Sequence, residues 1–176
     1  IGASITKLRS SYKKLSLSQV QLMPNVSIRV KDEWGSYVHS TINHDYNLKT
    51  IGGDKVVVDN ATGLMWHQNG FDDNINWSEA KEWVRSLNSR GYAGYHDWRL
   101  PTLEEVASLL ESNKRNGRYI DPVFSKKQKR IWTGDIKDAI SREKVNAAWC
   151  VRFSDGSVRW DYINYWYYVR PVRSME

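Results

Sequence analysis

Two arginines near the C-terminus, Arg152 and Arg159, have a spacing that suggests anion binding. They flank residues 154–157, in which Asp155-Gly156 is a strong signal for a two-residue β-hairpin turn. A turn at those two residues places Arg152 directly opposite Arg159 on adjacent strands. Like charges in that position destabilise a sheet unless a negative group lies between them. We therefore predict either a bound anion, such as a sulfate or carboxylate on a glycan, or compensation by Asp161.

A run of aromatic residues follows the second arginine. Trp and Tyr are unusually common in this chain, with nine Trp and ten Tyr against three Phe. Rigid aromatic side chains stack on sugars or anchor protein partners, and arginine pairs with anions. The alternative, that half of these side chains belong to the core, is equally consistent with the sequence. We predict a ligand-binding surface made of both residue types: Arg152, Arg159, Trp160, Tyr162, Tyr165, Trp166 and Tyr167.

No pattern in the chain indicates catalysis, and we predict no catalytic residue. The four histidines lie in unrelated segments, and none belongs to a His-Glu-x-x-His or Cys-x-x-Cys pattern that would bind a transition metal. Cys150, the only cysteine, has apolar strand neighbours, which favours a buried thiol over a nucleophile. Glu104 and Glu105 are adjacent on an expected helix and point in different directions, so they do not form a facing pair of catalytic carboxylates. We expect neither a metal nor an organic cofactor.

The net charge of the chain favours some partners over others. Twenty-six Lys and Arg against 20 Asp and Glu give a net charge of +6, which attracts acidic glycans and other polyanions. Solubility is the simpler explanation of the same excess. The basic residues are interleaved with acidic ones and form no basic-aromatic motif, so we do not expect nucleic-acid binding. No apolar run is long enough to cross a bilayer, and we expect no membrane insertion.

These side chains must be positioned by a mixture of helices and strands. Asn76-Trp77-Ser78-Glu79 has capping-box spacing, and apolar residues follow at helical intervals until Gly91, which predicts a helix over 77–89. Pro101–Glu105 repeats that pattern before a second helix. Gly63 at positive φ would allow a turn between two early strands. The predicted strands cover residues 55–58, 64–67, 131–133, 147–153 and 158–162.

The first 50 residues form an N-terminal extension in this interpretation. One short helix is expected at 15–23, where Ser16 can act as the cap and Pro24 ends the helix. No hydrophobic period persists from Asp32 to Lys49, so we expect an irregular connector there. The main domain then covers residues 51–176.

Three islands of sequence resemble one bacterial family. They are Asp-Asn-Ala-Thr-Gly-Leu-Met-Trp at 59–66, Asp-Trp-Arg-Leu-Pro-Thr at 97–102 and Tyr-Val-Arg-Pro-Val-Arg at 168–173. The family is the one called domain of unknown function 1566, the C-terminal domain of collagen-like surface proteins. Residues 131–133 and the hairpin at 148–156 are also similar to it, and the order of all the pieces agrees. The resemblance covers residues 51–176.

The resemblance implies an α+β, C-type-lectin-like fold in which two helices pack on small antiparallel sheets with long loops. Within it, Trp98 is expected to plug the core below the sheet, and Arg99 to satisfy backbone carbonyls or an acidic partner. Pro101 is expected to set φ ahead of the helix cap. We expect scaffold roles rather than binding roles for the signature residues: Trp66, Trp98, Arg99, Pro101, Trp132 and Trp149.

The chain is also distantly similar to formylglycine-generating enzymes, which share the lectin-like fold and a similar closing strand. Those enzymes use a pair of cysteines, whereas this chain has Cys150 alone, so their oxidase activity is not implied. Calcium-dependent lectins of the same superfamily carry Glu-Pro-Asn or Gln-Pro-Asp and Trp-Asn-Asp motifs together with disulfides. None of these is present, and calcium-mediated sugar binding is not expected.

From the resemblance we expect a non-catalytic ligand-binding or adhesion module of a bacterial surface or secreted protein, with a glycan or a protein as its ligand. One alternative is a hypervariable ligand-binding protein of a diversity-generating retroelement, suggested by the Tyr- and Asn-rich segment 161–168. Another is a regulatory or assembly domain of a larger bacterial protein.

Overall fold

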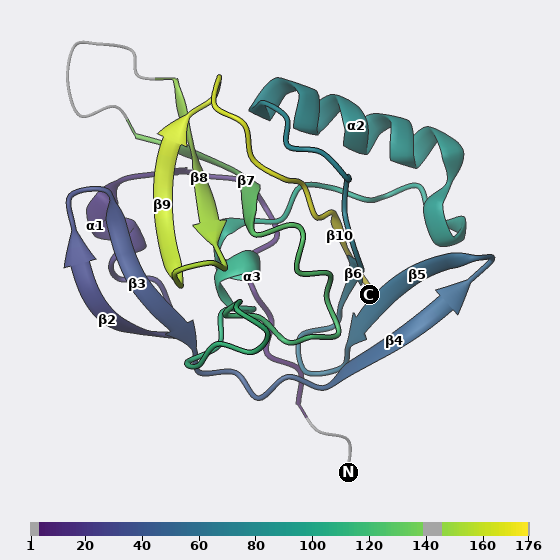
Figure 1. Cartoon of the computed structure of the whole chain (residues 1–176), viewed down its shortest axis with the longest axis horizontal. Coiled ribbons are helices and arrows are strands. Elements are labelled where there is room, and N and C mark those ends of the chain that lie inside the picture. Colours follow the sequence, from purple (N-terminus) through teal and green to yellow (C-terminus); the bar gives the residue numbers. More distant parts are fainter. Residues whose placement is uncertain (1–3, 139–145, 176) are drawn as a thin grey trace.

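The computed structural model describes residues 4–138 and 146–175, and in them the chain forms two β-sheets and three α-helices (Figure 1). A single 3-10 turn, η1 (Tyr92–Gly94), follows the longest helix. The helices are α1 (Leu17–Val20), α2 (Trp77–Arg90) and α3 (Leu103–Ala107). The strands are β1 (Lys14–Leu15), β2 (Val26–Asp32), β3 (Gly35–Ser40), β4 (Tyr46–Ile51), β5 (Asp54–Asp59), β6 (Leu64–His67), β7 (Arg130–Lys137), β8 (Ala147–Arg152), β9 (Ser157–Tyr162) and β10 (Val172–Ser174).

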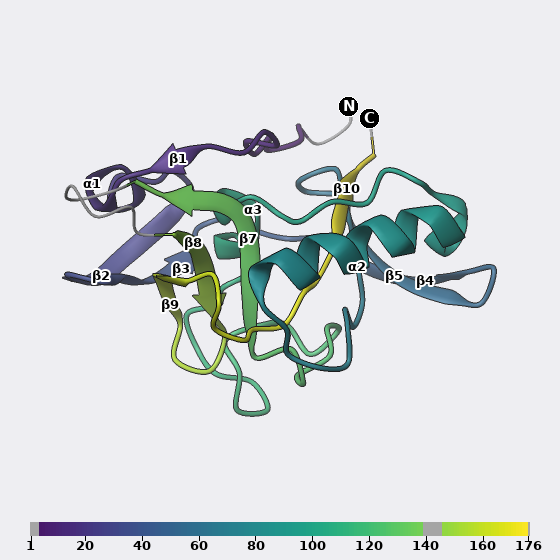
Figure 2. The ribbon, with the colours of Figure 1, turned by 90° about the horizontal axis from the view of Figure 1, so that it is seen from above.

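The two sheets lie toward opposite ends of the molecule (Figures 1 and 2). The larger sheet has the order β1-β7-β8-β9-β3-β2, in which only the β1–β7 pair is parallel. The smaller sheet has the order β10-β6-β5-β4 and is antiparallel throughout. The chain is therefore a mixed α+β protein, and the predicted hairpin of β5 and β6 is confirmed, with Gly63 at φ +70° in its turn.

Both faces of the central strands are buried, which produces two apolar cores instead of one. In β8, Trp149 and Val151 point into a core that contains α3, whereas Ala148 and Cys150 point into a core that contains α2. The valines of β5 are divided in the same way. A strand buried on both faces is apolar at nearly every position, and this explains the continuous apolar run of β8.

The two predicted capping boxes are present. Asn76 caps α2 together with Glu79, and the helix ends at Gly91, whose φ of +74° gives the left-handed C-cap. Thr102 caps α3 together with Glu105 in the same way. The helix predicted at 15–23 is confirmed in a shorter form, because α1 covers one turn after its cap, Ser16.

The irregular connector predicted for 32–49 is wrong, because most of this segment is strand. In strand β3 the large apolar side chains, Tyr37 and Val38, are at adjacent positions, so this strand shows no apolar alternation. Strand β4 lies at the edge of the smaller sheet and has mostly exposed side chains, so it carries no apolar alternation either. The N-terminal segment contributes strands to both sheets.

A buried carboxylate fastens the first residues of the chain to the rest. Asp135, in a bulged part of β7, accepts two hydrogen bonds from the Arg9 guanidinium, at 2.9 and 2.7 Å. It also accepts from the backbone N–H groups of Lys13 (2.8 Å) and Leu103 (2.7 Å). The side chain of Asp135 is fully buried and that of Arg9 nearly so. One carboxylate therefore joins the N-terminal segment, the first turn of α3 and β7.

We expect the Arg9→Met variant to lose about 3–5 kcal/mol of its free energy of unfolding, because it leaves a buried carboxylate without its cation. Urea denaturation monitored by tryptophan fluorescence measures the change. The matched control is Arg85→Met, which breaks the exposed Arg85–Glu82 pair and should cost less than about 1 kcal/mol. Equal losses in the two variants would show that the Arg9–Asp135 pair does not anchor the segment.

Candidate functional site

The predicted binding residues lie on both faces of the larger sheet. The hairpin of β8 and β9 is confirmed, but its register is wrong by two residues, because Arg152 lies opposite Ser157 and Cys150 lies opposite Arg159. The loop has four residues instead of two, and Gly156 has φ +78° in it. Asp155 closes this wider turn by accepting hydrogen bonds from the N–H and hydroxyl groups of Ser157. A shift of two residues leaves each side chain on its predicted face but changes its neighbours.

The predicted pair of Arg152 and Arg159 does not exist. Arg159 instead forms an ion pair with Asp32 (Nη2–Oδ2, 3.1 Å) and donates to the Tyr37 hydroxyl (2.9 Å). Both partners come from the N-terminal strands β2 and β3. Arg159 is therefore compensated within the protein, and the bound anion predicted between the two arginines has no support.

Arg152 makes its contact through a tyrosine. Its Nη2 donates to the Tyr167 hydroxyl (3.2 Å), and that hydroxyl donates to Asp161. Asp161 thus compensates Arg152 indirectly, through Tyr167. Compensation by Asp161 was one of the two predicted alternatives. Tyr167 is only 2% exposed and packs against Trp132, with ring centroids 4.6 Å apart. The prediction that Tyr167 lies on an accessible binding surface is wrong.

Four aromatic side chains follow one another at the end of the larger sheet and form what we call the aromatic ledge: Trp34, Trp160, Tyr162 and Tyr165. Successive ring centroids are 4.9, 5.7 and 6.0 Å apart. Trp34 is 46% exposed, Tyr162 42% and Tyr165 54%, while Trp160 is half-buried between its neighbours. Trp166, next in the chain, is 65% exposed.

Strand geometry separates this ledge from the arginines. Trp160 and Tyr162 point to one face of β9, and Arg159 and Asp161 point to the other, because side chains alternate along a strand. The composite surface of arginines and aromatic residues is therefore divided by the sheet. The ledge keeps three of the predicted residues, Trp160, Tyr162 and Tyr165.

Trp34 is the ledge residue that sequence reasoning missed. It lies in the turn between β2 and β3, at the same end of the sheet as the end of β9 (Figure 1). The backbone N–H of Trp160 donates to the carbonyl oxygen of Trp34 (3.3 Å), which fixes the two residues side by side. The Trp34-Gly35 pair is the only signal in the sequence, and it lies within the predicted connector.

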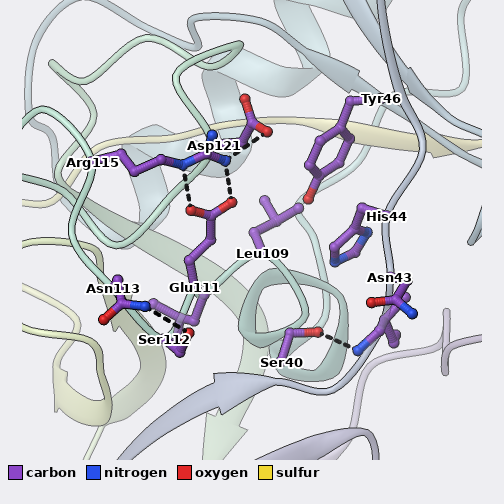
Figure 3. A pocket seen from close by; sticks show the side chains of 12 residues that line it. Ser40, Asn43, His44, Tyr46, Leu109, Glu111, Ser112, Asn113, Arg115 and Asp121 are labelled. Atoms are coloured by element: carbon purple, nitrogen blue, oxygen red, sulfur yellow. Dashed lines mark hydrogen bonds and ion pairs between the residues drawn. The ribbon is translucent and has the colours of Figure 1, made fainter.

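A polar pocket of about 430 Å³ lies elsewhere in the molecule, between the β3–β4 connection and the segment after α3 (Figure 3). On one side, Arg115 forms ion pairs with Glu111 (2.6 Å) and Asp121 (2.9 Å). On the other, His44 and Tyr46 stack with centroids 4.8 Å apart. Burial raises the pKa of the Tyr46 phenol well above its ordinary value, so this hydroxyl enters the pocket as a neutral group. No sequence pattern had indicated this pocket.

The histidine of the pocket is fully engaged. One ring nitrogen, Nδ1, lies 2.6 Å from the Asp59 carboxylate, and the other, Nε2, lies 2.5 Å from the carbonyl oxygen of Ser108. A His–Asp pair can activate a nucleophile only when the second nitrogen faces it. Here that nitrogen faces a backbone carbonyl, so His44 serves to join the β3–β4 connection to α3.

Two other side chains that could do chemistry are closed off by burial. Burial raises the pKa of the Cys150 thiol to about 12, and its Sγ donates to the carbonyl oxygen of Arg159 (3.2 Å). Burial, assisted by Arg170 and Arg90, lowers the pKa of His67 to about 3, so its ring is neutral. No cluster of three or more His, Cys, Asp or Glu in residues 4–138 and 146–175 could hold a metal ion, and no helix there could span a membrane.

The model of the Lcl C-terminal domain family matches residues 55–173, about two thirds of the chain. The chain belongs to this family. No curated protein matches it. The matched segment runs from β5 to β10 and contains both ends of the β8–β9 hairpin, whereas Trp34 and β2–β4 lie outside it. In this Lcl C-terminal domain the ledge is therefore completed by a residue from outside the family segment.

The signature residues of the Lcl C-terminal domain lie in or beside the core. Three of the signature indoles are fully buried, Trp66, Trp132 and Trp149, and Trp98 is buried with its Nε1 donating to the carbonyl oxygen of Tyr92 (3.0 Å). Arg99 forms a bidentate ion pair with Glu105, in which Nη1–Oε1 and Nη2–Oε2 are both 2.7 Å. Pro101 is buried directly before the cap of α3.

Asp59, the first residue of the signature segment 59–66, organises the turn between β5 and β6. Its carboxylate accepts from Thr62 Oγ1 (2.7 Å) and from the backbone N–H groups of Ala61 (3.0 Å) and Asp45 (3.1 Å), in addition to its contact with His44. Burial alone would raise the pKa of Asp59, but the hydrogen bonds from His44 and Thr62 outweigh it, and the pKa lies below the ordinary value.

We expect Asp59→Asn to lower the free energy of unfolding by about 1–3 kcal/mol at pH 7, because the amide cannot accept all of these hydrogen bonds. A carboxyl group with a lowered folded pKa stabilises the fold above its unfolded pKa, near 4, and loses that contribution as the pH falls through the folded pKa. The difference between wild type and variant should therefore shrink below pH 4. Urea titrations at pH 7, 5 and 3 measure it. Asp45→Asn, at an exposed position, is the control.

We expect Cys150 to resist iodoacetamide at pH 8 in the folded protein, because a buried thiol with a pKa of about 12 supplies almost no thiolate. The same thiol should react rapidly in 6 M guanidinium chloride. Mass spectrometry of the alkylated protein reads both states. Labelling of the folded protein at the rate of a free thiol would contradict the burial of this side chain.

Proposed function

We propose that this Lcl C-terminal domain is a non-catalytic, metal-independent binding module whose aromatic ledge holds a glycan chain. The observation that carries the proposal is the continuity of the ledge, in which each ring lies 4.9–6.0 Å from the next and three of the four are more than 40% exposed. Exposed aromatic side chains gathered in one place mark an interaction surface, whereas single exposed apolar residues are ordinary.

The shape of the ledge favours an elongated ligand. Its rings extend from the β2–β3 turn across the end of β9 to the loop that follows. Sugar rings present apolar faces that stack on indole and phenol rings, while their hydroxyl groups remain in water. Tyr and Trp suit this use because they provide a large contact area with few rotatable bonds.

We propose a non-catalytic role because the histidine and cysteine side chains that could react are buried or already hydrogen-bonded within the protein. His44 has both ring nitrogens in hydrogen bonds, His67 is neutral and buried, and Cys150 is buried as a thiol. We further propose a C-type-lectin-like topology and a place in a bacterial surface or secreted protein, both from the family resemblance. In that setting a glycan or a neighbouring protein would be the available ligand.

Glycan-array binding tests the proposal, and we expect binding that is unchanged by a chelator. Trp34→Ala and Tyr162→Ala should each weaken it by roughly 30-fold, since removal of a central aromatic contact costs about 2 kcal/mol. Isothermal titration with the best array glycan measures the loss.

Leu48→Ala is the matched control, because Leu48 is an exposed apolar residue on β4 in the other sheet. Its affinity should equal that of wild type. An array without any binding at low and high salt would overturn the glycan proposal, and loss of protein pull-down in the two ledge variants would assign the surface to a protein partner instead. Binding abolished by chelator would overturn the metal-independent mechanism.

A further inference from the structure

Arg170 lies in the interior of the protein without a counter-charge. Its side chain is fully buried. The guanidinium carbon lies 5.1 Å from the ring centroid of Phe124 and 5.9 Å from that of Phe153. Four other buried or nearly buried arginines of the chain each contact a carboxylate: Arg9, Arg99, Arg159 and Arg173. Within the described residues, Arg170 has no such partner.

Most of the donors of this guanidinium are unused by the protein. Nη2 donates to the carbonyl oxygen of Ser125 (2.8 Å), but Nε and Nη1 have no hydrogen-bond partner in the described part of the chain. The same is true of the indole Nε1 of Trp66, which packs edge-on against the Phe124 ring with centroids 6.4 Å apart. Trp66 and Arg170 thus present unpartnered N–H groups around one aromatic ring.

The charge of Arg170 persists at neutral pH. Burial lowers its pKa to about 9, partly opposed by Tyr46, so the guanidinium is still protonated at pH 7. The nearby His67 is neutral and supplies no negative charge. A buried cation costs several kcal/mol unless an anion accompanies it, and an unpartnered buried group calls for a bound water or ion.

We propose that Arg170 binds one monatomic anion, chloride under physiological conditions, inside the domain. A monatomic anion within reach of Nε or Nη1 accepts from the guanidinium and neutralises it, whereas a water molecule leaves the charge uncompensated. A multi-oxygen anion such as sulfate is larger and needs donors around all four of its oxygens, which one guanidinium does not supply.

The position of this site connects it to the polar pocket. Phe124 separates Arg170 from Tyr46, whose ring meets the Phe124 ring edge-on at 5.2 Å and lines the pocket. An anion held by Arg170 therefore fixes the segment that contains Phe124 and Ser125 against the segment leading into β10. The proposal is independent of glycan binding at the aromatic ledge.

Diffraction from wild-type crystals grown in sodium bromide tests the site directly. We expect an anomalous bromide peak within hydrogen-bonding distance of Arg170 Nε or Nη1. Density at this place that fits water and carries no anomalous signal would overturn the proposal. This measurement needs no variant and so does not depend on whether an altered protein folds.

Thermal unfolding in sodium chloride and in sodium gluconate of equal ionic strength gives a second readout. We expect saturable stabilisation by chloride, with a rise in Tm of about 3–6 °C at a tenfold excess over the dissociation constant. Arg170→Met should abolish this dependence. Arg173→Met, which breaks the Arg173–Asp97 pair, should lower Tm but keep the chloride dependence. Equal Tm values for wild type in the two salts, or an equal chloride effect in Arg170→Met, would overturn the proposal.

Discussion

The buried carboxylate of Asp135 is the constraint on which the arrangement of the other elements depends. It accepts from Arg9, Lys13 and Leu103, and so brings together the N-terminal segment, α3 and β7. A carboxylate is tolerated in the interior only when its oxygens are hydrogen-bonded and its charge is paired. Because the partners come from distant parts of the chain, Asp135 fixes where the N-terminal segment runs, and β1 then joins the larger sheet beside β7. Asp59 and Glu105 act similarly at the β5–β6 turn and at the cap of α3.

Burial of both sheet faces limits where a ligand can be held. The cores around α2 and α3 cover the middle of β7 and β8, and most of the exposed aromatic residues, Tyr12 excepted, gather at the end of β9 and in the adjoining turns. The ledge is built from a turn in the N-terminal segment and a strand of the family domain, and it exists only because β3 pairs with β9. The polar pocket, by contrast, is bounded by ion pairs and a neutral phenol.

Some buried polar side chains of the described residues have all their partners within the protein, and others do not. Asp59, Glu105 and Asp135 are saturated by protein donors and serve the fold. Arg170 retains unpartnered N–H groups and has no counter-charge in the described residues, which is why we assign it an anion. The ledge is a separate surface feature, and its half-buried member Trp160 has Lys137 5.9 Å from its ring and an Nε1 without a partner in the described residues. The proposed recognition surface and the proposed anion site are thus separate features of one scaffold.

The sequence by itself determined the local elements and the family. Features that depend on residues a few positions apart can be predicted from a sequence. They include the capping boxes of α2 and α3, the turn at Gly63 and the hairpin around Asp155. The polar edge strand β4 could not be predicted, because pairing with β5 stabilises it in the absence of an apolar period, whereas the alternation of Val26, Ile28 and Val30 did indicate strand β2 and was missed. Only the tertiary structure decided that Arg159 pairs with Asp32, that Tyr167 is buried and that Trp34 completes the ledge. Each of these contacts joins residues distant in sequence, and a register shift of two residues keeps every face while exchanging every neighbour.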